Sequence, residues 1–272
     1  MNSILLEDLI TEKGFYYQGN NQKTVILVHG LTGLPLEMKY VGKELNKKGF
    51  TVICPLLAGH AQGKKELLKT NYNDWYQTIK DVLLAIEEKV DQIYVAGICV
   101  GGMLGLKLAY EFKHTIKGAA VYSAAIRYDG WNIPLHGVLS PLIPIIGHLP
   151  PVKWLGFSER HPFGIKDDRL RNIIMRGDFL KDSEDKFPFQ TLRQMYKLND
   201  DMRDKFKEII TPTLLLHAKN DDLSHYRNSE YILSRLGGKK QLILLDDSYH
   251  MIHIDRERAK VVEYTADFFN KS

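Results

Sequence analysis

The sequence predicts an α/β fold, in which a mostly parallel central sheet carries helices on both faces and an insertion folds over the sheet as a cap. Three observations lead to this prediction. Short β-branched runs alternate with longer segments of helical periodicity along most of the 272 residues. The runs expected as strands are apolar throughout, which is typical of parallel strands that are buried on both faces. The alternation breaks between about residues 124 and 210, where the insertion is expected.

Six runs are expected to form the strands, because each is rich in apolar and β-branched residues. They lie at residues 24–29, 51–55, 92–96, 119–123, 213–217 and 241–245. Five helices are expected at residues 36–48, 73–89, 100–112, 227–236 and 256–269. In the second of these, Asn73 is suited to the N-cap, and one helical face carries Trp75, Ile79, Val82, Leu83 and Ile86.

A single domain of residues 1–272 is expected, with the cap insertion at about 124–210. The insertion contains most of the prolines of the chain: Pro134, Pro141, Pro144, Pro150, Pro151, Pro162 and Pro188. Because proline interrupts helices, this segment is expected to be irregular, with shorter helical pieces toward its end. We therefore interpret it as an insertion over the sheet and not as an independent domain.

The composition excludes several classes of protein. The net charge of +4 comes from scattered Lys and Arg residues, so the chain lacks the basic cluster of a nucleic-acid-binding protein. No apolar run approaches the roughly 20 residues of a membrane span, so stable membrane insertion is not expected. The first residues lack the basic region of a signal peptide, and two cysteines are too few for a disulfide framework. A cytoplasmic location is therefore expected.

A strained turn that presents a nucleophile is predicted around Cys99. The residues Gly97-Ile98-Cys99-Val100-Gly101-Gly102 follow a strand and open a helix, which is the context of a nucleophile elbow. The turn is so tight that side chains beside the nucleophile would clash, which explains Gly97 and Gly101. The start of a helix also favours a thiolate. Cys54 lies inside an expected strand and is interpreted as a buried hydrophobic residue.

A base and an acid are predicted after the last two strands. His250 lies on a loop beyond the final strand, from which an imidazole can reach the nucleophile and exchange a proton with it. Asp221 follows the preceding strand and is predicted to orient His250, with Asp222 as the alternative acid. His253 is the competing base. Nucleophile, acid and histidine then follow one another in chain order, each after a strand.

The turn after the first strand is predicted to form an oxyanion hole. In His29-Gly30-Leu31-Thr32-Gly33, the backbone N–H of Leu31 is expected to act together with the backbone N–H of Val100. His29 and Gly30 are expected to contact the substrate. No metal or cofactor is expected, because the histidines lack metal-ligand spacing and the glycines fit neither a Walker nor a Rossmann motif.

Two features of the cap leave alternatives open. The apolar side chains of Leu142, Ile145, Ile146 and Trp154 are expected either to line an acyl pocket over Cys99 or to form the core of the cap itself. A basic stretch follows, consisting of Arg160, His161, Lys166, Arg169, Arg171 and Arg176. It is interpreted either as a solvated surface or as a docking site for an acidic partner, such as an acyl carrier protein or the phosphates of coenzyme A.

With these motifs, the sequence resembles the α/β-hydrolase superfamily, and within it the small bacterial carboxylesterases and monoacylglycerol lipases. The resemblance runs from about Lys23 to the end of the chain. It rests on VILVHGLTG (25–33), PLLAGH (55–60), AGICVGG (96–102), HAKNDD (217–222) and SYHMIHID (248–255). These families normally carry serine where this chain has Cys99. A Gly-x-Cys-x-Gly-Gly elbow is similar to those of dienelactone hydrolases and polyhydroxyalkanoate synthases.

Three functions are consistent with these residues. The first is hydrolysis of a carboxylic ester or thioester with a hydrophobic acyl group, through a covalent acyl-enzyme on Cys99. The second is acyl transfer from a thioester donor to an amine, alcohol or thiol, because a thioester intermediate reacts readily with such acceptors. The third is a non-catalytic small-molecule-binding scaffold, which the complete set of nucleophile, base, acid and oxyanion turn disfavours.

Overall fold

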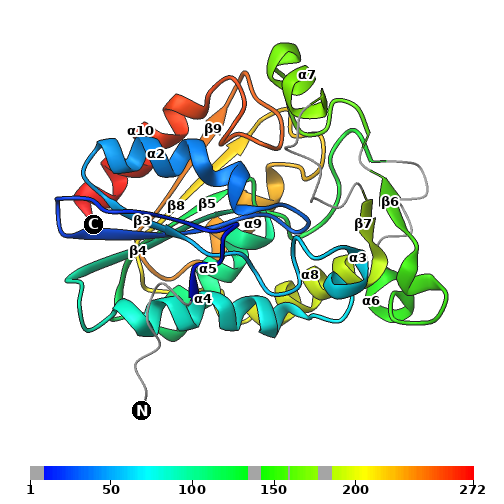
Figure 1. Ribbon diagram of the computed structural model, residues 1–272, viewed down its shortest axis with the longest axis horizontal. Helices are drawn as coiled ribbons and strands as arrows, with labels where there is room; N and C mark the ends of the chain where they lie inside the picture. The colour runs from blue at the N-terminus through cyan, green and yellow to red at the C-terminus, as the bar shows by residue number, and fades with distance from the viewer. Residues whose placement is uncertain (1–8, 134–141, 159, 177–185) are drawn as a thin grey trace.

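The computed structural model of the chain describes residues 9–133, 142–158, 160–176 and 186–272. Its central sheet has the strand order β1-β3-β2-β4-β5-β8-β9 (Figure 1). The strands run parallel to their neighbours except β1, which is antiparallel to β3. This arrangement confirms the predicted α/β fold. The strands are β1 (Phe15–Tyr17), β2 (Lys23–Val28), β3 (Thr51–Cys54), β4 (Gln92–Ile98), β5 (Ile116–Tyr122), β8 (Thr213–Ala218) and β9 (Lys240–Leu245).

Helices cover both faces of this sheet (Figure 1). On one face lie α2 (Lys39–Lys47) and α10 (Arg258–Lys271), which contact each other. On the other lie α4 (Tyr72–Ile86), α5 (Val100–Glu111) and α9 (Arg227–Arg235). Shorter helical turns are η1 (Pro35–Met38), α3 (Lys64–Leu67) and η5 (Phe206–Glu208).

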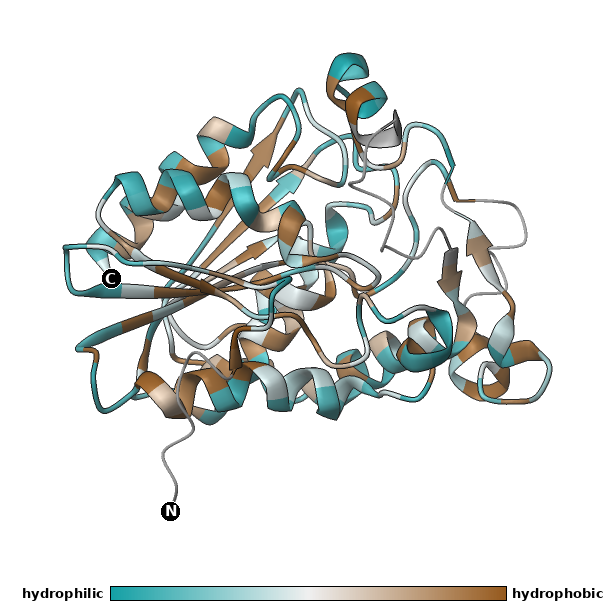
Figure 2. Ribbon diagram, in the orientation of Figure 1, coloured by the Kyte–Doolittle hydropathy of each residue, from teal (hydrophilic) through white to brown (hydrophobic). Residues whose placement is uncertain are grey.

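Two hydrophobic cores result from the alternation of side chains along the strands. In β2, Ile26 and Val28 face the core beneath α4 and α5, whereas Val25 and Leu27 face the core beneath α2 and α10. The central strands are accordingly apolar along their length, and the helices turn their polar faces outward (Figure 2). A strand buried on both faces therefore reads in the sequence as a continuous apolar run.

Local differences from the sequence-based prediction occur at the ends of elements. The helix expected at 36–48 is divided into η1 and α2, and Pro35 stands at the start of η1. The N-cap of α4 is Asn71 and not Asn73. The Asn71 side chain accepts the Asn73 N–H (2.9 Å), and Asp74 accepts the Asn71 N–H in return, which forms a capping box. The predicted apolar face of this helix is buried as expected.

The segment between β5 and β8, where the cap insertion is expected, contains several short elements and the longer helix α8. They are α6 (Ile143–Ile146), η3 (Val152–Trp154), β6 (Gly156–Ser158), α7 (Asp168–Arg176), β7 (Lys186–Pro188) and α8 (Phe189–Met202). Strands β6 and β7 form a separate antiparallel pair, which lies with α6 at the end of the molecule opposite the C-terminus (Figure 1). The rings of Phe157 on β6 and Phe187 on β7 pack with those of Tyr128 and Phe189. Residues 134–141 and 177–185 of the expected cap, with Pro134 and Pro141, lie outside the described residues.

The sheet gathers the predicted site residues at one edge. Parallel strands bring their carboxyl ends together, so the loops after β2, β4, β5, β8 and β9 meet there. The pairing registers place Ile98 beside Tyr122 and Ala218 beside Leu245 at this edge. None of the helices in the described residues is both long enough and apolar enough to span a membrane.

Candidate active site

Cys99 occupies the turn between β4 and α5. It is the N-cap residue of α5, with φ 53° and ψ −119°. A positive φ is rare for a residue other than glycine and is maintained only when the surrounding structure enforces it. The Cys99 N–H donates a hydrogen bond to the carbonyl of Tyr122 (2.9 Å), which fixes the turn to β5. The structure therefore contains the predicted strained turn, with a half-buried thiol at the carboxyl edge of the sheet.

The glycines beside Cys99 are required by close backbone contacts. A Cβ atom on Gly97 would lie 2.5 Å from the carbonyl carbon of Gly101. A Cβ atom on Gly101 would lie 2.4 Å from the carbonyl oxygens of both Val28 and His29. The second contact shows that the end of β2 packs directly against the start of α5, so the loop after β2 lies next to Cys99.

The structure brings His250 and Asp221 together at this edge. The Nδ1 atom of His250 lies 2.8 Å from Oδ2 and 3.1 Å from Oδ1 of Asp221. Both side chains are almost completely buried. Asp221 engages Nδ1, so the remaining ring nitrogen is Nε2, and the Cys99 side chain interacts with His250 closely enough to raise the pKa of the imidazole. Residues from three different loops thus form one continuous chain of polar contacts.

The charges in this chain stabilise one another. Burial lowers the pKa of His250, but the charge of Asp221 and the hydrogen bonds to Asp221 and Cys99 outweigh burial, and the pKa is raised well above its ordinary value. Burial raises the pKa of Asp221, but interactions with His250 and His217 outweigh it and hold the pKa below its usual range. Asp221 is therefore ionised, and His250 readily carries a proton.

The alternative acid and the alternative base lie elsewhere. Asp222 does not contact the His250 ring. It accepts the backbone N–H groups of His250 (3.2 Å) and Gly164 (3.0 Å), so it supports the loop and not the imidazole. His253 is fully buried, and within the described residues neither of its ring nitrogens has a hydrogen-bond partner. The geometry favours Asp221 and His250 over these alternatives.

Within the part of the chain that the structure describes, two backbone N–H groups in this region are unengaged, that of Leu31 in the loop after β2 and that of Val100 at the start of α5. No hydrogen bond between described residues uses the N–H of Leu31 or that of Val100. The Gly30 N–H is already occupied, because it donates to Oε1 of the buried Glu37 (2.6 Å). Glu37 thereby holds the loop in shape. Sequence reasoning did not identify this residue.

His29 and Gly30 have positions that differ from the expected substrate contacts. The His29 ring is fully buried, and its Nδ1 atom donates to the Gly30 carbonyl (3.1 Å). Its Nε2 atom accepts the N–H of Leu57 (3.1 Å). Both ring nitrogens of His29 and the N–H of Gly30 are thus engaged within the chain. His29 instead ties the loop after β2 to the loop after β3, which His60 also does through the Leu31 carbonyl (2.9 Å).

The apolar cap residues face solvent in this structure. Ile145 is 66% exposed, and Leu142, Ile146 and Trp154 are between 37% and 46% exposed. They are therefore not part of the aromatic core of the cap, which leaves their expected role at an acyl pocket as the open alternative. The neighbouring Ile143 is buried.

The basic stretch is partly engaged within the chain. The Nζ atom of Lys166 lies 2.8 Å from Asp247, and Arg171 is buried, where it pairs with Asp168 and donates to the Ile165 carbonyl (2.7 Å). These contacts reduce the charge that the stretch offers to a partner. The side chain of Arg176 lies outside the described residues.

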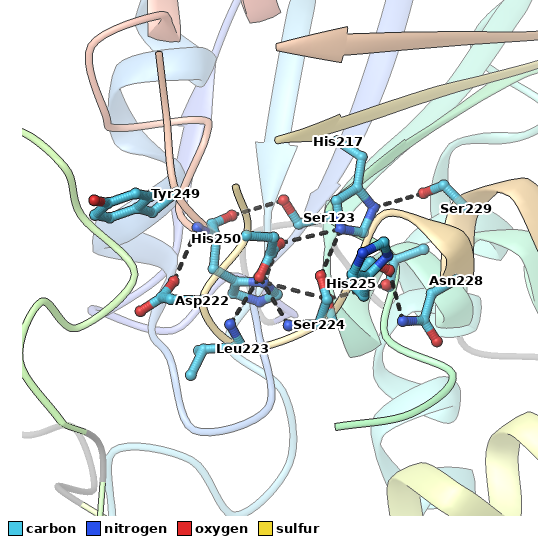
Figure 3. Close-up of polar contacts among 12 residues, drawn as sticks. Ser123, His217, Asp222, Leu223, Ser224, His225, Asn228, Ser229, Tyr249 and His250 are labelled. Carbon is cyan, nitrogen blue, oxygen red and sulfur yellow. Dashed lines mark hydrogen bonds and ion pairs between the residues drawn. The ribbon is translucent and has the colours of Figure 1, made fainter. Parts of the chain in front are cut away.

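Ser123 and Asp255 are further supports that sequence reasoning missed. The Ser123 hydroxyl donates to the His250 carbonyl (2.7 Å), and Figure 3 shows the His250 backbone held between Ser123 and Asp222. Asp255 is fully buried and accepts the N–H groups of Tyr249 (2.8 Å), Lys166 (2.8 Å) and Asp167 (2.9 Å). Their only signal in the sequence is that Ser123 directly follows a strand and Asp255 lies close to His250.

No group of three or more metal-ligating side chains occurs in the part of the chain that the structure describes. The arrangement brings together a thiol, an imidazole, a carboxylate and two backbone N–H groups that no other described residue engages. Such a set can form and resolve a covalent acyl intermediate.

Comparisons with known proteins show what the chain is similar to. Residues 19–257 match a family model described as serine aminopeptidase, S33. The chain is 27% identical to a carboxylesterase of Bacillus subtilis (strain 168), over 97% of this chain and 98% of that protein. It is 25% identical to a thermostable monoacylglycerol lipase of Bacillus sp. (strain H-257), over 94% of each. The structure also resembles the crystal structure of the monoacylglycerol lipase of Paleococcus ferrophilus, with a TM-score of 0.77 and 20% sequence identity. The match covers 94% of this chain and 98% of that protein's chain.

Proposed function

The chain belongs to the serine aminopeptidase S33 family of α/β-hydrolases, and from this premise we propose that it hydrolyses carboxylic esters of hydrophobic acyl groups through a covalent intermediate on Cys99. The observation that carries the proposal is the contact of His250 with both Asp221 and Cys99 at the strained turn. In this proposal Cys99 is the nucleophile, His250 the general base and acid, and Asp221 the orienting residue.

The first half of the proposed reaction acylates Cys99. His250 takes the thiol proton at Nε2, and the sulfur attacks the ester carbonyl to form a tetrahedral oxyanion. The N–H groups of Leu31 and Val100 donate hydrogen bonds to the oxyanion and stabilise its negative charge. They are available for this role because no hydrogen bond among the described residues uses them. The intermediate collapses, the carbon–oxygen bond of the ester breaks, and His250 returns the proton to the departing alcohol. A thioester remains on Cys99.

The second half releases the acid. His250 removes a proton from a water molecule, whose oxygen attacks the thioester carbonyl. The second tetrahedral intermediate collapses with loss of the Cys99 sulfur, which regains its proton from His250. The carboxylic acid leaves, and the enzyme returns to its starting state. Asp221 stabilises the imidazolium that forms in each half.

The full-length relatives support an ester substrate over a peptide. Although the family model is described as an aminopeptidase, relatives that match almost the whole chain are named carboxylesterase and monoacylglycerol lipase. A segment at about 124–210 is proposed to act as the cap, and the exposed apolar side chains of Leu142, Ile145, Ile146 and Trp154 are proposed to receive the acyl chain.

A second candidate function is favoured by the thiol itself. A thioester acyl-enzyme reacts more readily with amines and thiols than an oxoester does, so Cys99 is also suited to acyl transfer from a thioester donor. An acyl carrier protein or coenzyme A would be the donor. The engagement of Lys166 and Arg171 within the chain weakens the charge complementarity for such a donor, so hydrolysis is the preferred proposal. A purely binding function is disfavoured by the intact contacts among Cys99, His250 and Asp221.

The decisive experiment combines turnover with intact mass. We would incubate the protein with p-nitrophenyl esters and acyl thioesters of varied chain length, with and without an added amine. Ester hydrolysis predicts steady product release in water, and Cys99→Ala should abolish it. Cys99→Ser, which restores the usual residue of the resembling families, is the matched variant for testing acylation at this position.

Other outcomes separate the candidates. An acyl adduct on Cys99 that water barely clears, but that an amine discharges, would establish acyl transfer instead of hydrolysis. Full turnover in Cys99→Ala would overturn the covalent mechanism altogether.

A further inference from the structure

His217 is a buried histidine to which the proposed reaction assigns no role. It lies near the carboxyl end of β8, four residues before Asp221, and is completely buried. Its Nε2 atom lies 3.1 Å from Oδ2 of Asp221 and 2.9 Å from the carbonyl oxygen of Ser224. Its Nδ1 atom lies 2.7 Å from the hydroxyl of Ser229, a contact drawn in Figure 3. The same carboxylate oxygen that meets His250 therefore also meets His217.

These contacts assign the proton on the His217 ring. Nε2 faces two groups that only accept hydrogen bonds, so it carries a proton. Nδ1 faces a hydroxyl, which can donate to a bare ring nitrogen. A neutral imidazole protonated at Nε2 satisfies all three contacts, and no additional buried charge is needed.

The other oxygen of Asp221 is held mainly by its own loop. Oδ1 accepts the N–H groups of Leu223 (2.8 Å) and Ser224 (2.7 Å), and it also lies 3.1 Å from Nδ1 of His250. The carboxylate is thus anchored to its own loop, and Oδ2 makes both the contact with His217 and the shorter contact with His250. Removing His217 would consequently change the charge presented to His250 more than the place of the carboxylate.

We propose that His217 is a positioning residue that acts through Asp221: its N–H shares Oδ2 with His250 and thereby limits the charge that Asp221 presents to the imidazole. This inference rests on the proposed roles of His250 and Asp221. A carboxylate with one donor fewer would attract the imidazolium of His250 more strongly. His250 would then release its proton less readily to the leaving group, and turnover would slow.

Other ionisable groups also lie near Asp221 and His250. Asp222 lies beside Asp221 in the same loop and contacts the His250 backbone, and the charge of His250 acts on the buried His253. Cys99 also interacts with the His250 side chain. None of these contacts changes when His217 is replaced, so a change in the titration of His250 reports on Asp221.

The test compares His217→Leu with His217→Gln. The leucine variant removes the donor, whereas glutamine can place an amide N–H near the position of Nε2. We expect His217→Leu to lower kcat about ten- to hundredfold with little change in KM, the effect of losing one hydrogen bond to a charged group. NMR titration of the His250 ring, with Cys99→Ala as the common background, should show its pKa shifted upward. His217→Gln should recover most of both properties.

A second pair of variants tests the inference if His217→Leu fails to fold. Ser229→Ala leaves the ring in place but removes the hydroxyl that fixes its proton on Nε2, so it should change kcat and the His250 titration in the same direction by a smaller factor. Ser234→Ala on the same helix removes an exposed hydroxyl that donates to the Tyr231 carbonyl and accepts from Arg235, with no described contact to His217 or Asp221, and it should match the unmodified protein.

The outcomes distinguish this inference from the proposed function. If Asp221→Asn and Cys99→Ala are inactive but His217→Leu retains kcat and the His250 titration, the role of His217 alone is refuted. The same follows if His217→Gln is as impaired as His217→Leu. If Asp221→Asn retains full activity, the proposed function itself fails.

Discussion

The two cysteines of the chain occupy opposite environments. Cys54 is completely buried in β3, and burial, with the charge of Glu37, raises the pKa of its thiol well above the ordinary value. Cys99 is half-buried at the start of a helix and contacts His250. A thiolate is the reactive form of cysteine, so reactivity should follow these environments.

Alkylation with iodoacetamide should therefore discriminate between them. We expect Cys99 to react at least about tenfold faster than Cys54, since burial both protonates and shields the second thiol. Intact mass followed by peptide mapping measures the two rates, and Cys54→Ala should leave the rapid phase unchanged. Equal rates at both cysteines would mean that the turn does not activate its thiol.

The buried His253, whose ring nitrogens have no hydrogen-bond partner among the described residues, leads to a prediction about the free energy of unfolding. Burial and the charge of His250 lower its pKa to about 3, whereas an exposed histidine titrates near 6.5. Below pH 6.5 the unfolded chain binds a proton that folded His253 does not, so the free energy of unfolding falls as pH decreases from about 6.5 to 3. The raised pKa of His250 adds stability that is already complete below 6.5, and Asp221 loses its contribution only below its unfolded value of about 3.8.

His253→Leu should flatten this dependence. Because no described hydrogen bond is lost, we expect a small change at pH 7 but a slope of stability against pH reduced by up to about 1.4 kcal/mol per unit between pH 6 and 4. The buried His29, whose pKa is also lowered, continues to contribute acid sensitivity. Urea denaturation at several pH values measures the slope, and exposed His114→Leu is the control. An unchanged slope would contradict the prediction.

At the scale of elements, two buried carboxylates join the segment Gly164 to Asp167 to the loop that carries His250. Asp222 bridges the N–H groups of Gly164 and His250, and Asp255 bridges those of Lys166, Asp167 and Tyr249. The Met251 N–H also donates to the Gly164 carbonyl (2.8 Å). A Cβ atom on Gly164 would lie 3.3 Å from that of His250 and 2.8 Å from Met251, at a φ of +72°, so glycine is needed at this position.

Asp255→Asn should loosen this junction. Asparagine keeps one acceptor but turns an NH2 group toward a backbone N–H, so we expect a loss of about 1–3 kcal/mol in the free energy of unfolding. Activity should fall with it, because the position of the His250 loop depends on Asp255. Urea denaturation and kcat measure the two effects. The exposed Asp246, which pairs with Lys219 on the surface, provides the control Asp246→Asn. Identical behaviour of the two variants would exclude a role for the junction.

Features that are local in the sequence were predictable, whereas contacts between residues far apart in the chain were not. The apolar runs and the glycines around Cys99 are local features, so the sheet and the strained turn follow from the sequence alone. Strand β1 was missed because it has three residues, of which only Phe15 is buried. The contacts of His29 were not predictable for another reason: its hydrogen bond joins it to Leu57, 28 residues away, and no local pattern reveals such a partner.

At the scale of the whole molecule, the proposed cap segment, residues about 124–210, has to stay in contact with the helices that cover the sheet if the proposed site is to remain assembled. Helix α8, which leads back from the cap, contacts both α4 and α5. Lys107 on α5 stands at this junction with only 9% of its side chain exposed. Its Nζ atom lies 2.9 Å from Asp201 on α8, 3.3 Å from Glu111, and 5.0 Å from the centre of the Tyr76 ring on α4.

Lys107→Met should therefore weaken the joint between cap and sheet. Burial lowers the pKa of Lys107, but the two carboxylates outweigh it and raise the pKa, so the amine is charged and its removal leaves Asp201 and Glu111 with one cation fewer. Both carboxylates are partly exposed and Asp201 keeps Lys205, so we expect a loss of about 1–3 kcal/mol. Urea denaturation measures this loss, and limited proteolysis near α8 should become faster.

The control is Arg203→Met, which breaks an ion pair with Asp200 whose side chains are more than half exposed. It should cost less than about 1 kcal/mol. Equal costs for the two variants would show that the cap is held by apolar packing alone.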